Sequence, residues 1–294
     1  MSWTQSTITT TDPWNCIAFG KNTFVTVANI TGNTASSSDG ITWTQGTNMP
    51  WTSLWGNVWQ DMTYNDDKFV AIGWAWNSAE SLDGVNNWHG VNLPVQRYWN
   101  GVAYGQSTLV ATGTGFFSGP RNPYLNAIVA RSNDPHDWST SVMDTPAYWT
   151  DVAYGNGRFV AVSNGNSISS VSTSQGRSWV TGNNLPVSQN WSAINFGNGT
   201  FVTVGNSNTA AYSTDGVNWT TTTLPANQNW VDLAYGNNQW VAVASNSSTA
   251  AVSSDAITWT ASPMPSNQNW TAITFGNGKF VTVAANTAVV AVLS

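Results

Sequence analysis

Eleven side chains between positions 51 and 148 have the chemistry of a binding surface, because they are aromatic rings or arginines outside the repeated positions of the sequence. Aromatic rings stack on sugars, and Trp, Tyr and Arg anchor protein partners. The residues are Trp51, Trp55, Trp74, Trp76, Arg97, Tyr98, Phe116, Phe117, Arg121, Tyr124 and Tyr148. They fall in segments that we expect to be loops on one face of the molecule. We therefore predict a ligand-binding surface there, for a glycan or a protein. The alternative is that these longer loops fold over themselves and use the side chains as a small core of their own.

Three carboxylates recur at one position of the sequence. Asp61, Asp151 and Asp232 each stand two residues after a Trp that opens an apolar segment. If these segments surround an axis, the three carboxylates converge and could hold a cation such as Ca²⁺. The alternative, which we favour, is that each accepts hydrogen bonds from neighbouring segments. We predict no metal site and no cofactor.

A Gln-Asn pair recurs before the last three such Trp residues. The pairs are Gln189 with Asn190, Gln228 with Asn229, and Gln268 with Asn269. Equivalent pockets at these places would give several weak sugar sites that act together. The alternative is that the amides bond between loops and fix their spacing.

Groups for catalysis are scarce. Glu80 is the only glutamate, and His89 and His136 lie near expected turns with no Ser or Cys partner recognisable by spacing. Glycosidases need two opposed carboxylates, which only the three Asp residues above could supply. We therefore predict that the chain is not an enzyme.

Composition excludes several classes of partner. Charged residues make up 7% of the 294 residues, the net charge is −6, and the few Lys and Arg are scattered. Nucleic acid and anionic membranes are therefore poor partners. Cys16 is the only cysteine, and no stretch predicts a signal peptide or a membrane span. We expect a chain made as a soluble cytoplasmic protein, alone, as an oligomer or assembled into a virion.

The whole chain is built from one repeated unit. Segments of the form W-x-x-[ILVM]-x-[FY] begin at Trp14, Trp59, Trp99, Trp149, Trp191, Trp230 and Trp270. In the last copy, alternating apolar residues from 270 to 275 and from 280 to 283 predict two strands. Asn277 and Gly278 between them predict a tight hairpin turn. Two further strands complete each unit, which we expect to be a four-stranded antiparallel meander.

Strands with two apolar faces need cover on both sides, which sheets stacked in a ring provide. We therefore predict an all-β fold, a seven-bladed β-propeller of four-stranded antiparallel blades in a single domain, residues 1–294. The seventh unit lacks the fourth strand that carries Trp in the others, and residues 2–4, Ser-Trp-Thr, match that strand. Residues 1–8 should therefore complete the last blade and close the ring.

Between the third and fourth strands stand S-S-D-G-I-T-W at 37–43, S-T-D-G-V-N-W at 213–219 and S-S-D-A-I-T-W at 253–259. These resemble the Asp-box, or bacterial neuraminidase repeat, of sialidase-like propellers. The resemblance implies that the boxes are structural turns on the outer part of each blade, with Asp accepting backbone N–H groups. Sialidases also need an arginine cluster and a Tyr–Glu pair, which this chain lacks, so the resemblance implies a non-catalytic member.

These observations together predict a non-catalytic, glycan-binding propeller that uses its aromatic loops. One alternative is a structural or adhesive virion component, such as a phage tail or receptor-binding part, acting through protein contacts. A second alternative is a glycosidase.

Overall fold

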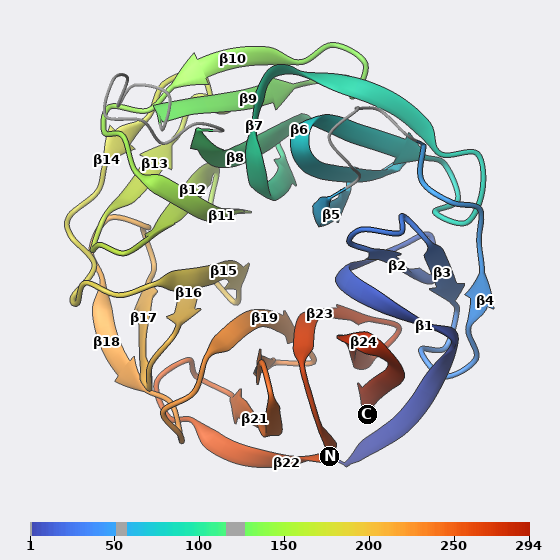
Figure 1. The fold of residues 1–294 in the computed structure, drawn as a ribbon. Coiled ribbons are helices and arrows are strands. Elements are labelled where there is room, and N and C mark those ends of the chain that lie inside the picture. Colours follow the sequence, from blue (N-terminus) through green and yellow to red (C-terminus); the bar gives the residue numbers. More distant parts are fainter. Residues whose placement is uncertain (1, 51–57, 116–126) are drawn as a thin grey trace.

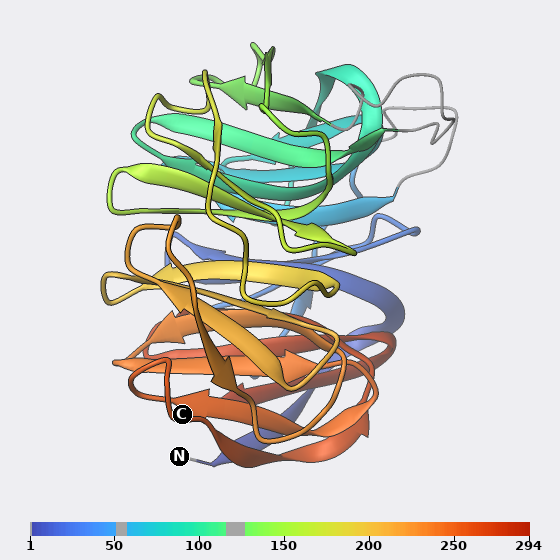
Figure 2. The ribbon, with the colours of Figure 1, turned by 90° about the vertical axis from the view of Figure 1, so that its left-hand side faces the viewer.

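The computed structural model describes residues 2–50, 58–115 and 127–294. Its strands pair antiparallel into five sheets, which stand around a central axis as the blades of a propeller (Figure 1). Seen from the side, the sheets stack face to face around the ring (Figure 2). This arrangement covers both apolar faces of the strands. The described ranges contain no helix long and apolar enough to cross a membrane.

Two sheets have six strands. One has the order β23 (Trp270–Gly276), β24 (Lys279–Leu293), β1 (Trp3–Gly20), β2 (Thr23–Ala28), β3 (Thr34–Ser37), β4 (Thr44–Gln45). The other has the order β10 (Ser139–Val142), β9 (Ile128–Ser132), β8 (Thr108–Gly115), β7 (His89–Gly105), β6 (Phe69–Ser81), β5 (Trp59–Tyr64).

Three sheets have four strands, each in sequence order. The first contains β11 (Tyr148–Gly155), β12 (Arg158–Asn164), β13 (Ser169–Ser172) and β14 (Val180–Thr181). The second contains β15 (Trp191–Gly197), β16 (Thr200–Gly205), β17 (Thr209–Ser213) and β18 (Thr220–Thr223). The third contains β19 (Trp230–Gly236), β20 (Gln239–Ala244), β21 (Ser247–Ser253) and β22 (Thr260–Gln268).

The prediction of seven four-stranded blades is wrong, because the propeller has five blades of four to six strands. The reason lies in β1 and β7, which are 18 and 17 residues long. Each continues from one sequence repeat into the next and pairs on both sides, so it joins two repeats into one sheet. The alternation of apolar and polar side chains does not reveal such a shared strand, because the pattern is the same whether one strand ends and another begins or a single strand continues.

The N-terminal residues do pair with the last repeat, as predicted. Trp3 pairs with Leu293 and Thr7 with Val289. The indole Nε1 of Trp3 also donates to Ser262 Oγ at 3.0 Å. The two ends of the chain therefore lie side by side and close the ring (Figure 1).

Every repeat has the same irregularity at the start of its first strand. The pairing with the second strand shifts register just after the opening Trp, as between Trp149 and Asp151. Such a β-bulge leaves one extra residue whose side chain is redirected. In this repeat the extra residue is Thr150, and its Oγ1 donates to the carbonyl of Trp191 in the next repeat at 2.8 Å.

The S-x-D turns have the geometry that the sequence predicts. Asp39 Oδ1 accepts the backbone N–H groups of Ile41 and Thr42, each at 2.8 Å, and Ser37 Oγ accepts that of Gly40. Bonds from Thr42 and Ile41 lower the pKa of Asp39 to about 2. Equivalent bonds occur at Asp83, Asp215 and Asp255. The acidic residue therefore shapes the turn.

Glycine at the end of a first strand allows an aromatic ring of the next repeat to approach the backbone. A Cβ at Gly155 would lie 2.0 Å from Cγ of Phe196. Phe196 packs in turn on Phe201, with ring centroids 4.7 Å apart. The same close approach occurs at Gly20, Gly105, Gly197, Gly236 and Gly276.

The core is divided into seven hydrophobic clusters, and each contains one of the seven opening Trp residues at 0% exposure. Each cluster joins neighbouring repeats. Trp191 and Phe201, for example, pack with Ala153 and Val160 of the preceding repeat. Side-chain packing thus follows the sequence repeats, whereas backbone hydrogen bonding groups them into five sheets.

Substituting Gly155→Ala should lower the free energy of unfolding by about 1–3 kcal/mol, because a methyl group would overlap the Phe196 ring. Chemical denaturation measures this. In the double variant Gly155→Ala/Phe196→Ala the methyl group has room, so the loss should be smaller than the sum of the two single losses. Additive losses would contradict the contact.

Candidate functional site

The axis of the propeller contains two cavities, of about 490 and 350 Å³. Asp61, Asp151 and Asp232 line both, so they lie where the cavities meet. The larger cavity is lined by residues at the beginnings of the first strands, among them Asn190 and Asn229. We call this side of the propeller the loop face.

A further hollow of about 620 Å³ lies on the loop face and is lined by Tyr148 and Pro146. It shares Asn100, Thr150 and Asn164 with the larger axial cavity. The two hollows therefore adjoin each other, and together we call them the depression.

Amide side chains dominate the polar lining of this depression. They are Asn15, Gln60, Asn100, Asn164, Asn166, Asn190 and Asn229. Amides both donate and accept hydrogen bonds, as peptide groups do. None of the described residues that line the axial cavities is Lys, Arg or His. Three of these amides already donate within the protein: Asn15 to the Trp59 carbonyl, Asn100 to the Trp149 carbonyl and Asn229 to Ser245 Oγ. The depression is therefore polar, with the three carboxyl groups at its axial end.

Each axial carboxylate joins two repeats. Asp232 Oδ1 accepts the N–H of Leu233 on its own strand at 2.7 Å, and Oδ2 accepts that of Ile273 on the next repeat at 2.8 Å. Asp61 bonds in the same way to Met62 and Val102, and Asp151 to Val152 and Ile194. No three His, Cys, Asp or Glu residues in the described ranges could hold a metal ion. The geometry thus favours the hydrogen-bonding interpretation over a cation site.

Burial raises the pKa of all three carboxyl groups, although their backbone hydrogen bonds oppose the rise. The pKa of Asp61 is about 6 and that of Asp232 about 7. The pKa of Asp151 is raised well above its ordinary value, by burial and by the charges of Asp61 and Asp232. Asp61 and Asp232 therefore change charge closer to neutral pH than an ordinary aspartate.

The structure brings some of the predicted aromatic residues together. Trp74 is 37% exposed and packs edge-on against Tyr98, with ring centroids 4.6 Å apart. Tyr148 is 49% exposed beside the depression, and Trp76 is half-buried. The predicted residues outside the described ranges are Trp51, Trp55, Phe116, Phe117, Arg121 and Tyr124.

Arg97 is not on the surface, contrary to the prediction. It is 1% exposed and lies 5.7 Å from the ring centroid of Trp99. Its Nη1 donates to the carbonyl of Ile128 at 3.4 Å, and burial lowers its pKa to about 10. The guanidinium therefore packs inside the six-stranded sheet.

The Gln-Asn pairs are mostly engaged with neighbouring loops. Gln189 donates to Thr209 O at 2.9 Å, and Gln228 Oε1 accepts a bond from Ser247 Oγ. Gln268 donates to Ser266 Oγ at 3.3 Å, and the carbonyl of Asn269 accepts the N–H of Ala285. Of the six residues, only Asn190 and Asn229 line the axial cavity.

Asn100, Thr150 and Asn164, which line both hollows, are not among the residues predicted from the sequence. A signal for the first two was present, because the residue after the opening Trp is polar in every repeat except the sixth, which has Val231. Nothing in the repeat pattern singles out Asn164.

No protein-family model and no curated protein sequence matches the chain. Solved structures do. A catalytically inactive variant of virginiamycin B lyase from Staphylococcus aureus, with quinupristin, has a TM-score of 0.83 at 12% identity and covers 99% of this chain and 98% of its own. YCF48 bound to D1 peptide has a TM-score of 0.74 at 16% identity, with 99% and 94% covered. YCF48 from Cyanidioschyzon merolae has a TM-score of 0.73 at 15% identity, with 100% and 98% covered. These likenesses show a shared propeller fold.

These findings correct the predicted function. The similar structures are a lyase and a peptide-bound protein, and nothing among them supports a glycan-binding or virion role. The prediction that the chain is not an enzyme is also overturned, because an enzyme shares the fold along nearly its whole length. Scarcity of Glu and His was not a sound reason to exclude catalysis. The Asp-box resemblance rests on the turns alone.

The axial carboxylates should make the protein less stable as pH rises from about 4 to 7. Because their folded pKa values are raised, the native state binds more protons than the unfolded state, so Asp61 up to about pH 6 and Asp232 up to about pH 7 each lower the free energy of unfolding by on the order of 1 kcal/mol per pH unit. Asp232→Asn should flatten the decline, as measured by chemical denaturation at several pH values.

Asp39→Asn is the control for this experiment. The pKa of Asp39 is lowered, so its contribution to stability is lost only as pH falls below about 4. The variant should keep the wild-type slope between pH 4 and 7. An unchanged slope in Asp232→Asn would show that this carboxyl does not titrate in the window.

Proposed function

We propose that the chain binds a segment of a partner protein in the depression on the loop face. The observation that carries this proposal is that two hollows adjoin and share Asn100, Thr150 and Asn164. Such a depression accommodates an extended chain better than a compact small molecule.

The chemistry of the depression supports a peptide. Amides of its lining such as Asn164 and Asn190 can pair with the donors and acceptors that an extended backbone presents along its length. Tyr148, which lines the depression, exposes aromatic surface, and rings of this kind anchor partner side chains. A propeller of the same fold, YCF48, has been solved bound to D1 peptide.

The charge of the axial cavity favours a partner segment that carries Lys or Arg. Asp61, Asp151 and Asp232 line the cavity, and no basic side chain among the described lining residues neutralises them. Carboxylates in a narrow cavity with low-dielectric walls concentrate negative potential. A basic side chain near the axis would complement that potential.

Selection from a phage-displayed random peptide library tests the proposal. Enriched peptides should bind the purified chain, and Tyr148→Ala and Asn164→Ala should each weaken that binding roughly tenfold. Leu82→Ala, which removes exposed apolar surface beside a turn outside the depression, should bind as the wild type does. Peptides that bind Tyr148→Ala and Asn164→Ala normally, or no enrichment at all, would refute the proposal.

Affinity for enriched peptides that contain Lys or Arg should rise from about pH 5.5 to about pH 8. Over this range Asp61 and Asp232, with pKa values of about 6 and 7, lose their protons. Isothermal titration calorimetry at the two pH values measures the change, and a neutral peptide of equal length is the control. Equal pH dependence of both peptides would contradict the role of the carboxylates.

A further inference from the structure

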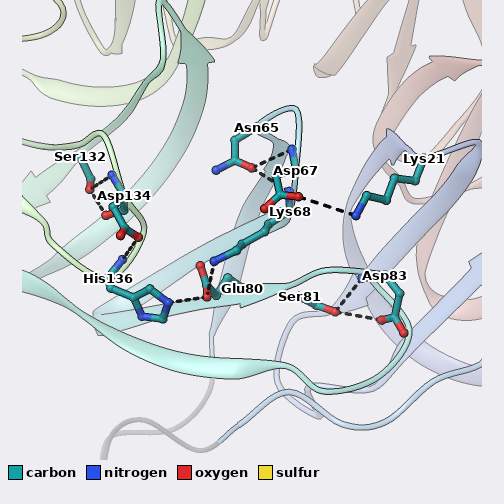
Figure 3. Close-up of polar contacts among 10 residues, drawn as sticks. All are labelled: Lys21, Asn65, Asp67, Lys68, Glu80, Ser81, Asp83, Ser132, Asp134 and His136. Carbon is teal, nitrogen blue, oxygen red and sulfur yellow. Dashed lines mark hydrogen bonds and ion pairs between the residues drawn. The ribbon is translucent and has the colours of Figure 1, made fainter.

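A second site, built around Glu80 on β6, lies outside the depression (Figure 3). The Glu80 side chain is 8% exposed, and its Oε1 accepts bonds from Lys68 Nζ at 2.9 Å and His136 Nε2 at 2.8 Å. Oε2 is buried and has no hydrogen-bond partner among the described residues. The chain's only glutamate thus orients two cationic or polar partners and keeps one oxygen unpaired.

Both histidines of the chain meet at this site. Glu80 pairs with His89 across β6 and β7, and the turn between β9 and β10 brings His136 alongside. The two imidazole centroids are 5.5 Å apart, with the ring planes at 75°. A cavity of about 290 Å³ is lined by both rings, by Glu80 and by Lys68.

The contact with Glu80 sets the tautomer of His136. Because Nε2 donates to the carboxylate, Nδ1 of the neutral ring carries the lone pair. The His136 side chain is 48% exposed, so solvent reaches it. A histidine that ligates a metal typically donates its other ring nitrogen to a carboxylate, which fixes the ring and makes it more basic. Glu80, held by Lys68, provides that carboxylate.

We propose that His136 and His89 bind a divalent transition-metal ion, with Cu²⁺ and Zn²⁺ as the expected class, and that Glu80 positions His136. Imidazole nitrogen suits these ions, at about 2.0–2.1 Å from Zn²⁺. Two imidazoles with centroids 5.5 Å apart are close enough to share one ion. The site is separate from the proposed peptide depression and stands whether or not a peptide binds there.

Lys68 offsets the charge of Glu80, and two further carboxyl groups lie near the histidines. Asp83 lines the same cavity, and Asp134 Oδ1 accepts the backbone N–H of His136 at 3.1 Å. Since no group of three His, Cys, Asp or Glu among the described residues could hold a metal, water completes the coordination. The expected ion is therefore exchangeable, and Cu²⁺ binds more tightly than Zn²⁺.

Few other side chains of this chain could bind such an ion. The chain has no other histidine, and its single thiol, Cys16, is buried with its pKa raised by that burial. Imidazole-dependent metal binding can therefore come only from His89 and His136.

Calorimetric titration of the full chain with CuCl₂ and with ZnCl₂ tests the proposal. One equivalent should bind, and His89→Ala and His136→Ala should each weaken binding at least tenfold, as expected for loss of a ligand. Glu80→Gln should weaken it about 10- to 100-fold, as loss of a carboxylate behind a metal ligand does. Asp137→Asn removes the same charge from the neighbouring exposed position and should leave binding unchanged.

His89 and His136 are exposed, so their variants keep the fold and decide the proposal even if Glu80→Gln does not fold. Electron paramagnetic resonance of the Cu²⁺ form should show two imidazole nitrogens, and one in either histidine variant. Absence of binding by the wild type, or wild-type binding by the double variant His89→Ala/His136→Ala, would overturn the metal site. Equal weakening by Glu80→Gln and Asp137→Asn would overturn the positioning role of Glu80.

Discussion

Polar contacts between the inner strands of consecutive repeats are the constraint on which this propeller depends. Apolar packing between repeats is strong but non-directional, so it cannot fix how one repeat is placed along the next. Directed bonds do so at all seven junctions. In chain order they are made by Asn15, Asp61, Asn100, Thr150 with Asp151, Ser192, Asp232 and Thr271. The bond from Thr271 to the Trp14 carbonyl, 2.9 Å long, completes the circle.

This constraint accounts for the axial carboxyl group of Asp232. Val231 follows the sixth opening Trp and has no polar group to reach the next repeat, and there Asp232 makes the bond instead. Burying a carboxyl group is unfavourable for its charged form, and the raised pKa values reflect that cost. The same tethers leave negative charge at the axial end of the depression, so the requirement that holds the ring together also shapes its binding chemistry.

Much of the fold could be predicted from the sequence, because the same residue types recur at the same positions of each repeat and indicate which side chains pack and where the chain turns. The opening Trp residues, the hairpin at Asn277 and Gly278 with positive φ angles of 45° and 75°, and the pairing of Trp3 with the last repeat all follow from local pattern. The number of blades does not, since it depends on whether β1 and β7 continue or break.

The sites were harder to predict for a different reason. Glu80 and His136 are 56 positions apart, and only the pairing of β6 with β7 and the course of β9 and β10 bring them within 2.8 Å. Arginine is a residue type that often anchors partners at protein surfaces, so Arg97 was predicted to be exposed. It is buried because the surrounding sheet covers it, which the sequence pattern does not show. Asn100 and Thr150 carried a readable signal, the polar residue after each opening Trp, whereas Asn164 is placed only by the tertiary structure.

The clasp between β1 and β24 gives the molecule a particular mechanical weakness. Trp3 and Leu293 sit opposite each other at the same end of an antiparallel ladder. Tension applied through these two residues therefore breaks the interstrand hydrogen bonds one after another. It does not load all of them at the same time, as a shearing force would. The ring therefore yields first between β1 and β24, within one six-stranded sheet, while the other four sheets remain intact.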